Sequence, residues 1–232
     1  MQDLAPLIAI IGCDGSGKST LSADILARVR QDRRAESCYL GLGSGAMGNR
    51  IKAWPVIGRL LERRLSAKAD RARDRSDRIP GVTTALVLYG FSLKRRKRFR
   101  AMMALRRAGV TVVTDRYPQI DVPGFYDGPG LSAARAEGWL IARLARREKA
   151  IYRAMADTLP TLVIRLNIDV DTALARKPDH ARALIERKVA VTPALTFNGA
   201  PILDLDATEP YALVVAKATA AVMQALERPA PA

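Results

Sequence analysis

The segment that most constrains this chain lies near its N-terminus, where an apolar run over residues 4–11 leads directly into Gly12-Cys13-Asp14-Gly15-Ser16-Gly17-Lys18-Ser19. This stretch fits the pattern G-x-x-x-x-G-K-[ST] of a phosphate-binding loop. Its glycines let the backbone curl so that successive N–H groups point inward, and the helix after the loop adds the positive end of its dipole. The pattern therefore predicts a strand, a nucleoside triphosphate site and a helix, in that order.

Two side chains of the loop carry chemistry of their own. We expect the Lys18 ammonium to reach the β- and γ-phosphates and the Ser19 hydroxyl to bind Mg²⁺. The alternative is a glycine turn without a ligand, which the strand and helix patterns on either side disfavour. The expected binding residues for ATP, with Mg²⁺ as its partner ion, are consecutive: Gly12, Cys13, Asp14, Gly15, Ser16, Gly17, Lys18, Ser19 and Thr20.

Apolar, β-branched runs alternate along the chain with segments of helical periodicity. The expected strands are Leu4–Ile11, Cys38–Leu42, Val110–Thr114, Thr161–Ile168 and Pro201–Leu205. The expected helices are Lys18–Gln31, Thr83–Ala108, Ser132–Leu159, Asp171–Arg176, His180–Val189 and Glu209–Glu227. This alternation predicts an α/β fold with a parallel sheet and helices on both of its faces. The length favours one domain over residues 1–228, followed by a short tail at 229–232.

The third long helical stretch makes a more specific prediction. Ser132 is a residue type that commonly caps a helix N-terminus, so we expect the helix to begin there. Its apolar side chains recur at helical spacing and are expected to face the core. They are Trp139, Leu140, Ile141, Leu144 and Ile151.

The formal charge of +15 is concentrated in one part of the chain. Residues 50–107 hold 18 Lys or Arg against 4 Asp or Glu, and the remainder holds 20 against 19. This excess favours an anionic partner, and the alternative is a solvated face. Within it, residues 51–75 predict a basic amphipathic helix that packs on the protein or lies on an anionic membrane. Only two cysteines occur, without metal-ligand spacing, which fits the cytosol.

A second chemical landmark, Thr114-Asp115-Arg116-Tyr117-Pro118, follows the third apolar run. Parallel strands place such residues at the carboxyl edge of the sheet, where open α/β sheets bind ligands. A carboxylate there can hold magnesium or its water shell, so Asp115 is a candidate metal ligand. Arg116 could bind a phosphate of a second substrate, whereas the alternative is a surface ion pair.

Together with the phosphate-binding loop, Asp115-Arg116-Tyr117 makes the chain resemble the thymidylate kinase family of nucleoside monophosphate kinases. The segment Leu166-Asn167-Ile168-Asp169-Val170-Asp171, followed by Ala173-Leu174 and Arg176, is similar to the strand and helix that lead into that family's lid. The resemblance implies a three-layer P-loop NTPase fold with sheet order 2-3-1-4-5, a short lid at 176–188 and a homodimer.

The resemblance also implies roles for particular residues. It assigns Lys18 and the loop amides to ATP, Ser19 and Asp115 to magnesium, and Asp14 to a hydroxyl of the acceptor substrate. Arg116 and the neighbouring Tyr117 are then candidates for acceptor binding. The family places a catalytic arginine in the loop or in the lid, and this loop has none. The lid must therefore supply the charge, from Arg176, Lys177 or Arg182; no role falls to His180.

The acceptor half of the chain departs from the family pattern. Gly41-Leu42-Gly43-Ser44-Gly45 replaces an Arg-Glu-Pro-Gly-Gly type motif, and Pro118-Gln119-Ile120-Asp121-Val122-Pro123-Gly124 replaces the usual residues after the tyrosine. The position of the family's base-contacting arginine falls on Leu93, with Lys94 and Arg95 as adjacent candidates for substrate binding. These departures favour an anionic acceptor other than thymidine monophosphate, bound near the basic region 51–107. The alternatives are a true thymidylate kinase and an ATP-dependent protein that binds nucleic acid or membranes.

Overall fold

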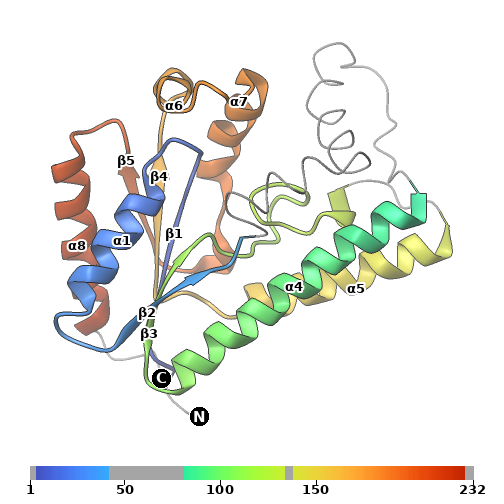
Figure 1. The fold of residues 1–232 in the computed structure, drawn as a ribbon, viewed down its shortest axis with the longest axis horizontal. Helices are drawn as coiled ribbons and strands as arrows, with labels where there is room; N and C mark the ends of the chain where they lie inside the picture. The colour runs from blue at the N-terminus through green and yellow to red at the C-terminus, as the bar shows by residue number, and fades with distance from the viewer. Residues whose placement is uncertain (1–3, 42–80, 134–137, 228–232) are drawn as a thin grey trace.

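The computed structural model describes residues 4–41, 81–133 and 138–227. Five strands form one parallel sheet in the order β2-β3-β1-β4-β5, as predicted (Figure 1). The strands are β1 (Leu7–Gly12), β2 (Ala35–Tyr39), β3 (Thr111–Asp115), β4 (Leu162–Asn167) and β5 (Ile202–Asp206). The helices are α1 (Lys18–Val29), α4 (Gly81–Arg107), α5 (Trp139–Ala156), α6 (Val170–Arg176), α7 (Arg182–Val191) and α8 (Tyr211–Glu227). Short 3-10 turns lie at Leu131–Ala133, Thr192–Ala194 and Phe197–Gly199.

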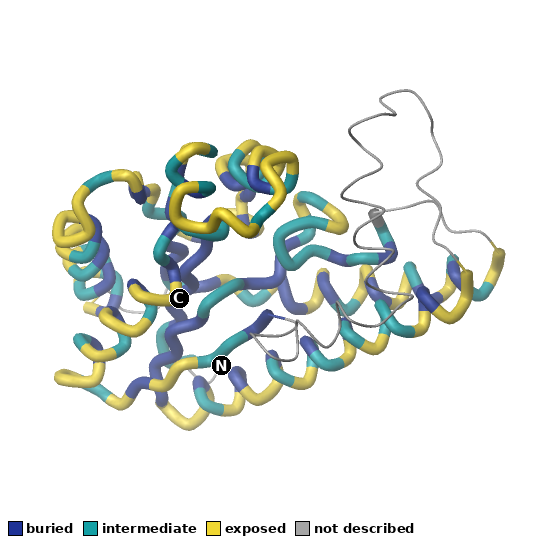
Figure 2. The backbone as a smooth tube through the Cα atoms, turned by 45° about the horizontal axis from the view of Figure 1, so that its top comes forward, coloured by how far each residue is buried: buried dark blue, intermediate teal, exposed yellow. Residues whose placement is uncertain are grey.

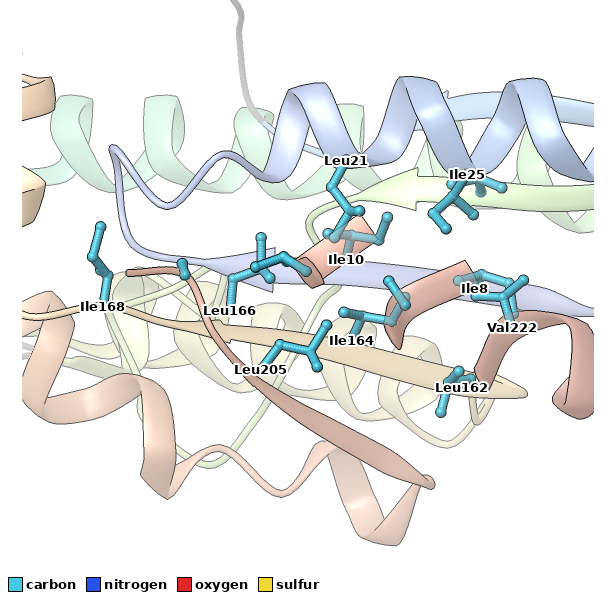
Figure 3. Packing of buried hydrophobic residues seen from close by; sticks show 14 of the residues in the cluster. Ile8, Ile10, Leu21, Ile25, Leu162, Ile164, Leu166, Ile168, Leu205 and Val222 are labelled. Carbon is cyan, nitrogen blue, oxygen red and sulfur yellow. The ribbon is translucent and has the colours of Figure 1, made fainter. Parts of the chain in front are cut away.

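The sheet separates two apolar layers because successive side chains of a strand point to opposite faces. Ile8 and Ile10 of β1 pack against α1 and α8, in a cluster that includes Leu21 and Val222 (Figure 3). Leu7, Ala9 and Ile11 point to the other face, toward α4 and α5. Every residue of β1 is buried, which explains why this strand is so apolar in the sequence. Figure 2 shows the buried strands at the centre and exposed residues along the outer sides of the helices.

The second strand begins earlier than predicted. The sequence favoured Cys38–Leu42, whereas β2 spans Ala35–Tyr39, with Ala35 opposite Thr111 of β3. The strand lies at an edge of the sheet, and Glu36 and Ser37 are exposed. An edge strand needs less apolar surface than a central one, so its polar first half gave no signal.

The third long helix is also shorter than predicted. Ser132 belongs to a separate 3-10 turn rather than to the helix cap, and α5 begins at Trp139, directly after Gly138, which has a φ of 87°. Ile141 and Leu144 are buried as expected, but the Trp139 side chain is 74% exposed, so its assignment to the core is wrong. Trp139 is the first residue of α5, at the end of the helix that projects beyond the sheet (Figure 1).

Several predictions lie outside the described residues. The amphipathic segment 51–75 and most of the motif at 41–45 fall in the undescribed range 42–80. Within the described ranges, no helix combines the length and the apolar character needed to cross a membrane.

Candidate active site

The loop between β1 and α1 has the curled backbone that phosphate binding requires. Gly15 has a φ of 86°, and a Cβ atom there would lie 2.9 Å from the carbonyl oxygen of Ala173 in α6. Gly17, with a φ of 84°, occupies the cap position of α1 and offers no side chain to its first N–H groups. The N-terminus of α1 is therefore free to bind an anion at the carboxyl edge of the sheet.

Lys18 is held across this loop. Its ammonium donates a hydrogen bond of 3.0 Å to the carbonyl oxygen of Cys13 and lies 3.8 Å from Oδ1 of Asp14. Burial lowers the pKa of Lys18, while the charge of Asp14 opposes that effect. The positive charge is thus concentrated at the centre of the loop, where phosphate oxygens would replace the carbonyl as acceptors.

Ser19 and Asp115 meet although 96 residues separate them. The pairing of Ile10 with Asp115 aligns the ends of β1 and β3, and the Ser19 hydroxyl donates a 3.0 Å hydrogen bond to Oδ2 of Asp115. The second carboxylate oxygen, Oδ1, is buried and has no hydrogen-bond partner in the described part of the chain. Mg²⁺ prefers hard oxygen ligands, and a hydroxyl beside an unpaired carboxylate oxygen supplies them.

Asp14 contacts a residue that we did not predict, Lys188 of α7. The ammonium of Lys188 forms a close ion pair with Oδ2 of Asp14, and Nε2 of His180 lies 3.8 Å from the same oxygen. Burial by itself would raise the pKa of Asp14, but the charge and hydrogen bond of Lys188 lower it to about 2. Lys188 is the last residue of the predicted lid, 176–188. The sequence analysis predicted that range but did not name Lys188 as a site residue.

The two arginines predicted for the lid occupy different environments. Arg176 of α6 donates hydrogen bonds to the carbonyl oxygens of Gly15 (3.2 Å) and Ala207 (3.0 Å), so it bridges the loop and the end of β5. Arg182 of α7 is exposed and pairs with Asp171 at 2.9 Å. The structure therefore brings Arg176, but not Arg182, to the phosphate-binding loop.

Two proteins of Escherichia coli K12 align with nearly all of this sequence. YghR, named an uncharacterized ATP-binding protein, is 44% identical over 217 residues, which is 93% of this chain and 86% of YghR. YghS, with the same description, is 45% identical over 221 residues, or 95% of this chain and 93% of YghS. The chain belongs to the YghR/YghS family. No protein-family model matches it.

In this YghR/YghS-family chain, Arg116, the residue that follows β3, is held in a restrained conformation. Its φ is 76°, a left-handed value that is uncommon for a side chain of this size. Its guanidinium lies 3.5 Å from Oδ2 of Asp127, whose charge raises the pKa of Arg116 further. A Cβ atom at Gly41 would lie 2.8 Å from Cδ of Arg116, so a larger residue there would have to displace this side chain. The backbone and Asp127 together fix where this guanidinium can reach.

The Arg95 side chain lies in the protein interior rather than in an open binding site. Only 1% of its side chain is exposed, and it forms an ion pair with Asp127. It also donates hydrogen bonds to the carbonyl oxygen of Leu40 (2.9 Å) and the hydroxyl of Tyr152 (2.8 Å). Leu93, on which the position of the family's base-contacting arginine falls, is exposed. Lys94 is half-buried beside Arg95 in α4.

Tyr117 does not lie in the site of this YghR/YghS-family chain. Its ring is buried, with its centroid 6.1 Å from that of Phe99, and its hydroxyl donates a hydrogen bond to the carbonyl oxygen of Thr158. Thr158 follows α5 and precedes β4, at the opposite edge of the sheet from the phosphate-binding loop. This placement does not fit a contact between Tyr117 and an acceptor.

Proposed function

We propose that this protein is an ATP-dependent phosphotransferase that moves the γ-phosphoryl group of Mg-ATP to an anionic acceptor other than thymidine monophosphate. The observation that supports it best is the contact between Ser19 and Asp115 beside Lys18, with Arg116 as the next residue of the same strand end. The names of YghR and YghS as ATP-binding proteins support ATP as the nucleotide.

Each group at the edge of the sheet has a part in this proposal. The loop amides and Lys18 would bind the β- and γ-phosphates, and Ser19 and Asp115 would hold Mg²⁺. When bound, the ion offsets charge on the phosphate oxygens. Arg176 donates a hydrogen bond to the loop carbonyl of Gly15 and would supply positive charge to the transferred group. Arg182 is a weaker candidate because it is paired with Asp171 on the surface.

The acceptor would bind between Asp14 and Arg116. Arg116 offers a fixed guanidinium for a phosphate or carboxylate, and Asp14 offers a carboxylate that can accept a hydrogen bond from a hydroxyl. In phosphoryl transfer, an acceptor oxygen bonds to the γ-phosphorus while the bond to the β,γ-bridging oxygen breaks and ADP leaves. Lys94 and Arg95 would act indirectly, because Arg95 is bonded to Asp127, which also holds Arg116.

A coupled assay of ADP release tests the proposal. The acceptors are the nucleoside monophosphates, including thymidine monophosphate, a panel of sugar phosphates and a blank. Phosphorylated acceptors other than thymidine monophosphate should stimulate turnover, and Lys18→Ala and Asp115→Asn should abolish it. Asp171→Asn is the matched control, because that carboxylate is exposed and pairs with Arg182 rather than with a residue of the loop. Strong stimulation by thymidine monophosphate would identify a thymidylate kinase instead, and ATP hydrolysis that no acceptor stimulates would refute the transferase.

A further inference from the structure

The outward face of α5 carries a continuous stripe of positive charge. Arg143, Arg146 and Arg153 are exposed and lie four, seven and fourteen residues after Trp139, a spacing that puts all of them on one side of the helix. Arg147 and Lys149 are exposed on either side of the stripe. The opposite side is buried, through Ile141, Leu144, Tyr152 and Met155. The stripe is therefore an external surface rather than part of the core.

Neither α4 nor α5 contributes an exposed acidic side chain to this surface, and the exposed Asp157 caps the C-terminal end of α5. The sequences of α4 and α5 contain a single carboxylate, Glu148, which is 1% exposed and bonded to Ser92 and to the backbone N–H of Leu131. Helix α4 packs beside α5 on the same face of the sheet and adds exposed cations at positions 97, 100 and 107 (Figure 1). None of the exposed cations of either helix forms an ion pair with another described residue.

Exposed apolar side chains lie at one end of the same layer. Trp139 begins α5, and Val82, Leu86 and Leu93 are exposed on the N-terminal half of α4. Both helices start at the end that projects beyond the sheet (Figure 1). Proteins that bind the surface of an anionic bilayer combine exposed indole and aliphatic groups with a row of arginines in this way. The Trp side chain enters the head-group region, and the Arg side chains pair with lipid phosphates.

We propose that the outer face of α4 and α5 binds the surface of anionic phospholipid membranes. This surface is separate from the proposed active site and does not depend on the proposed activity. A second copy of the chain is a poor partner, because the two faces would carry like charges. Nucleic acid is also less suitable, because Val82, Leu86 and Leu93 cannot stack on bases as aromatic rings do, whereas a bilayer can bury them.

Sedimentation of the full chain with vesicles tests the proposal. Vesicles of phosphatidylglycerol and phosphatidylcholine should bind the protein, and pure phosphatidylcholine should not. The variant Arg143→Gln/Arg146→Gln/Arg153→Gln should lower the partition coefficient about 100-fold, because each cation lost from the membrane surface lowers it about fivefold. The control Arg30→Gln/Arg34→Gln/Lys217→Gln removes the same charge from exposed positions outside the layer and should change binding less than about threefold. Equal losses in the two variants would overturn the proposal.

Fluorescence gives a second, local measurement that does not require the triple variant to fold. The chain has two tryptophans, so Trp54→Phe leaves Trp139 as the only indole. Its emission should shift to the blue on anionic vesicles and return when NaCl reaches about 0.5 M. An unchanged spectrum while the protein sediments with the vesicles would show that another surface binds. Tighter binding to duplex DNA than to vesicles, unaffected by Trp139→Ala, would overturn the membrane in favour of nucleic acid.

Discussion

Two carboxylates at the edge of the sheet, Asp14 and Asp127, each lie between two cations, but their surroundings differ. Asp14 is 20% exposed and pairs with the flexible amines of Lys18 and Lys188. Asp127 is 10% exposed and pairs with the guanidinium groups of Arg95 and Arg116. The first cluster joins the phosphate-binding loop to α7, and the second joins α4 to the residue that follows β3.

The difference lies in how readily each cluster can exchange partners. A lysine amine is a single rotatable point charge, so Lys18 and Lys188 can turn from Asp14 to phosphate oxygens when a nucleotide binds. A guanidinium has a planar set of donors, and those of Arg95 are also bonded to Leu40 and Tyr152. The cluster around Asp14 is therefore suited to binding, and the cluster around Asp127 to holding Arg116 in place.

The strongest test of this comparison is Asp127→Ala. Removing the carboxylate leaves the buried guanidinium of Arg95 without its ion-pair partner, and breaking a buried pair in this way costs about 3–5 kcal/mol. We expect the free energy of unfolding, measured by urea denaturation, to fall by that amount. Asp171→Ala removes an exposed carboxylate and serves as the control, with a change of about 0.5 kcal/mol or less. A loss below about 1 kcal/mol at Asp127 would contradict the structural role.

The second test concerns the pH dependence of the pair between Asp14 and Lys188. The pKa of Asp14 is lowered from 3.8 to about 2, which corresponds to about 2 kcal/mol of stability. Because the folded pKa is the lower one, this contribution is fully present above about pH 4 and is lost as the pH falls toward 2. Asp14→Asn should therefore destabilise the protein by about 2 kcal/mol at pH 7, and the difference from wild type should shrink at pH 3. A difference that is constant with pH would show that the ion pair is not its source.

A smaller effect is expected at Tyr117, which borders the acceptor side but points into the core. Tyr117→Phe removes the hydroxyl that donates to the carbonyl oxygen of Thr158 and should lower the free energy of unfolding by about 1 kcal/mol. The KM for the acceptor should not change. An increase in KM of tenfold or more without a change in stability would restore Tyr117 to the acceptor site.

The smallest effect is expected at Arg182, whose pair with Asp171 is exposed to solvent. Arg182→Ala should change the free energy of unfolding by less than about 0.5 kcal/mol and the turnover rate by less than about twofold. Arg176→Ala, in contrast, removes the arginine that contacts the loop carbonyl of Gly15 and should lower turnover by about 10³-fold. Steady-state kinetics on both variants distinguish the two lid arginines, and a large loss at Arg182 alone would reverse their assignment.

Long-range pairings explain most of the differences between prediction and structure. The position of β1 and the meeting of Ser19 with Asp115 agree with the sequence analysis, because a buried parallel strand and its loop carry their own pattern. The sheet order agrees with the order that the resemblance to the thymidylate kinase family implied. The boundaries of β2 and α5 were wrong, since an exposed edge strand needs few apolar residues and a 3-10 turn can precede a helix. Lys188 and Asp127 were missed because single charged residues in a charged chain give no signal until their partners are known.

The sequence by itself determined the alternation of strands and helices along the chain, the position of the phosphate-binding loop and the excess of positive charge, because periodicity, glycine spacing and composition are local properties. The tertiary structure decided which cations meet which carboxylates: Lys188 with Asp14, and Arg95 with both Asp127 and the interior. It also decided that the arginines of α5 face outward on one side. Contacts of this kind depend on how helices from distant parts of the chain pack on a common sheet, and no local pattern encodes that arrangement.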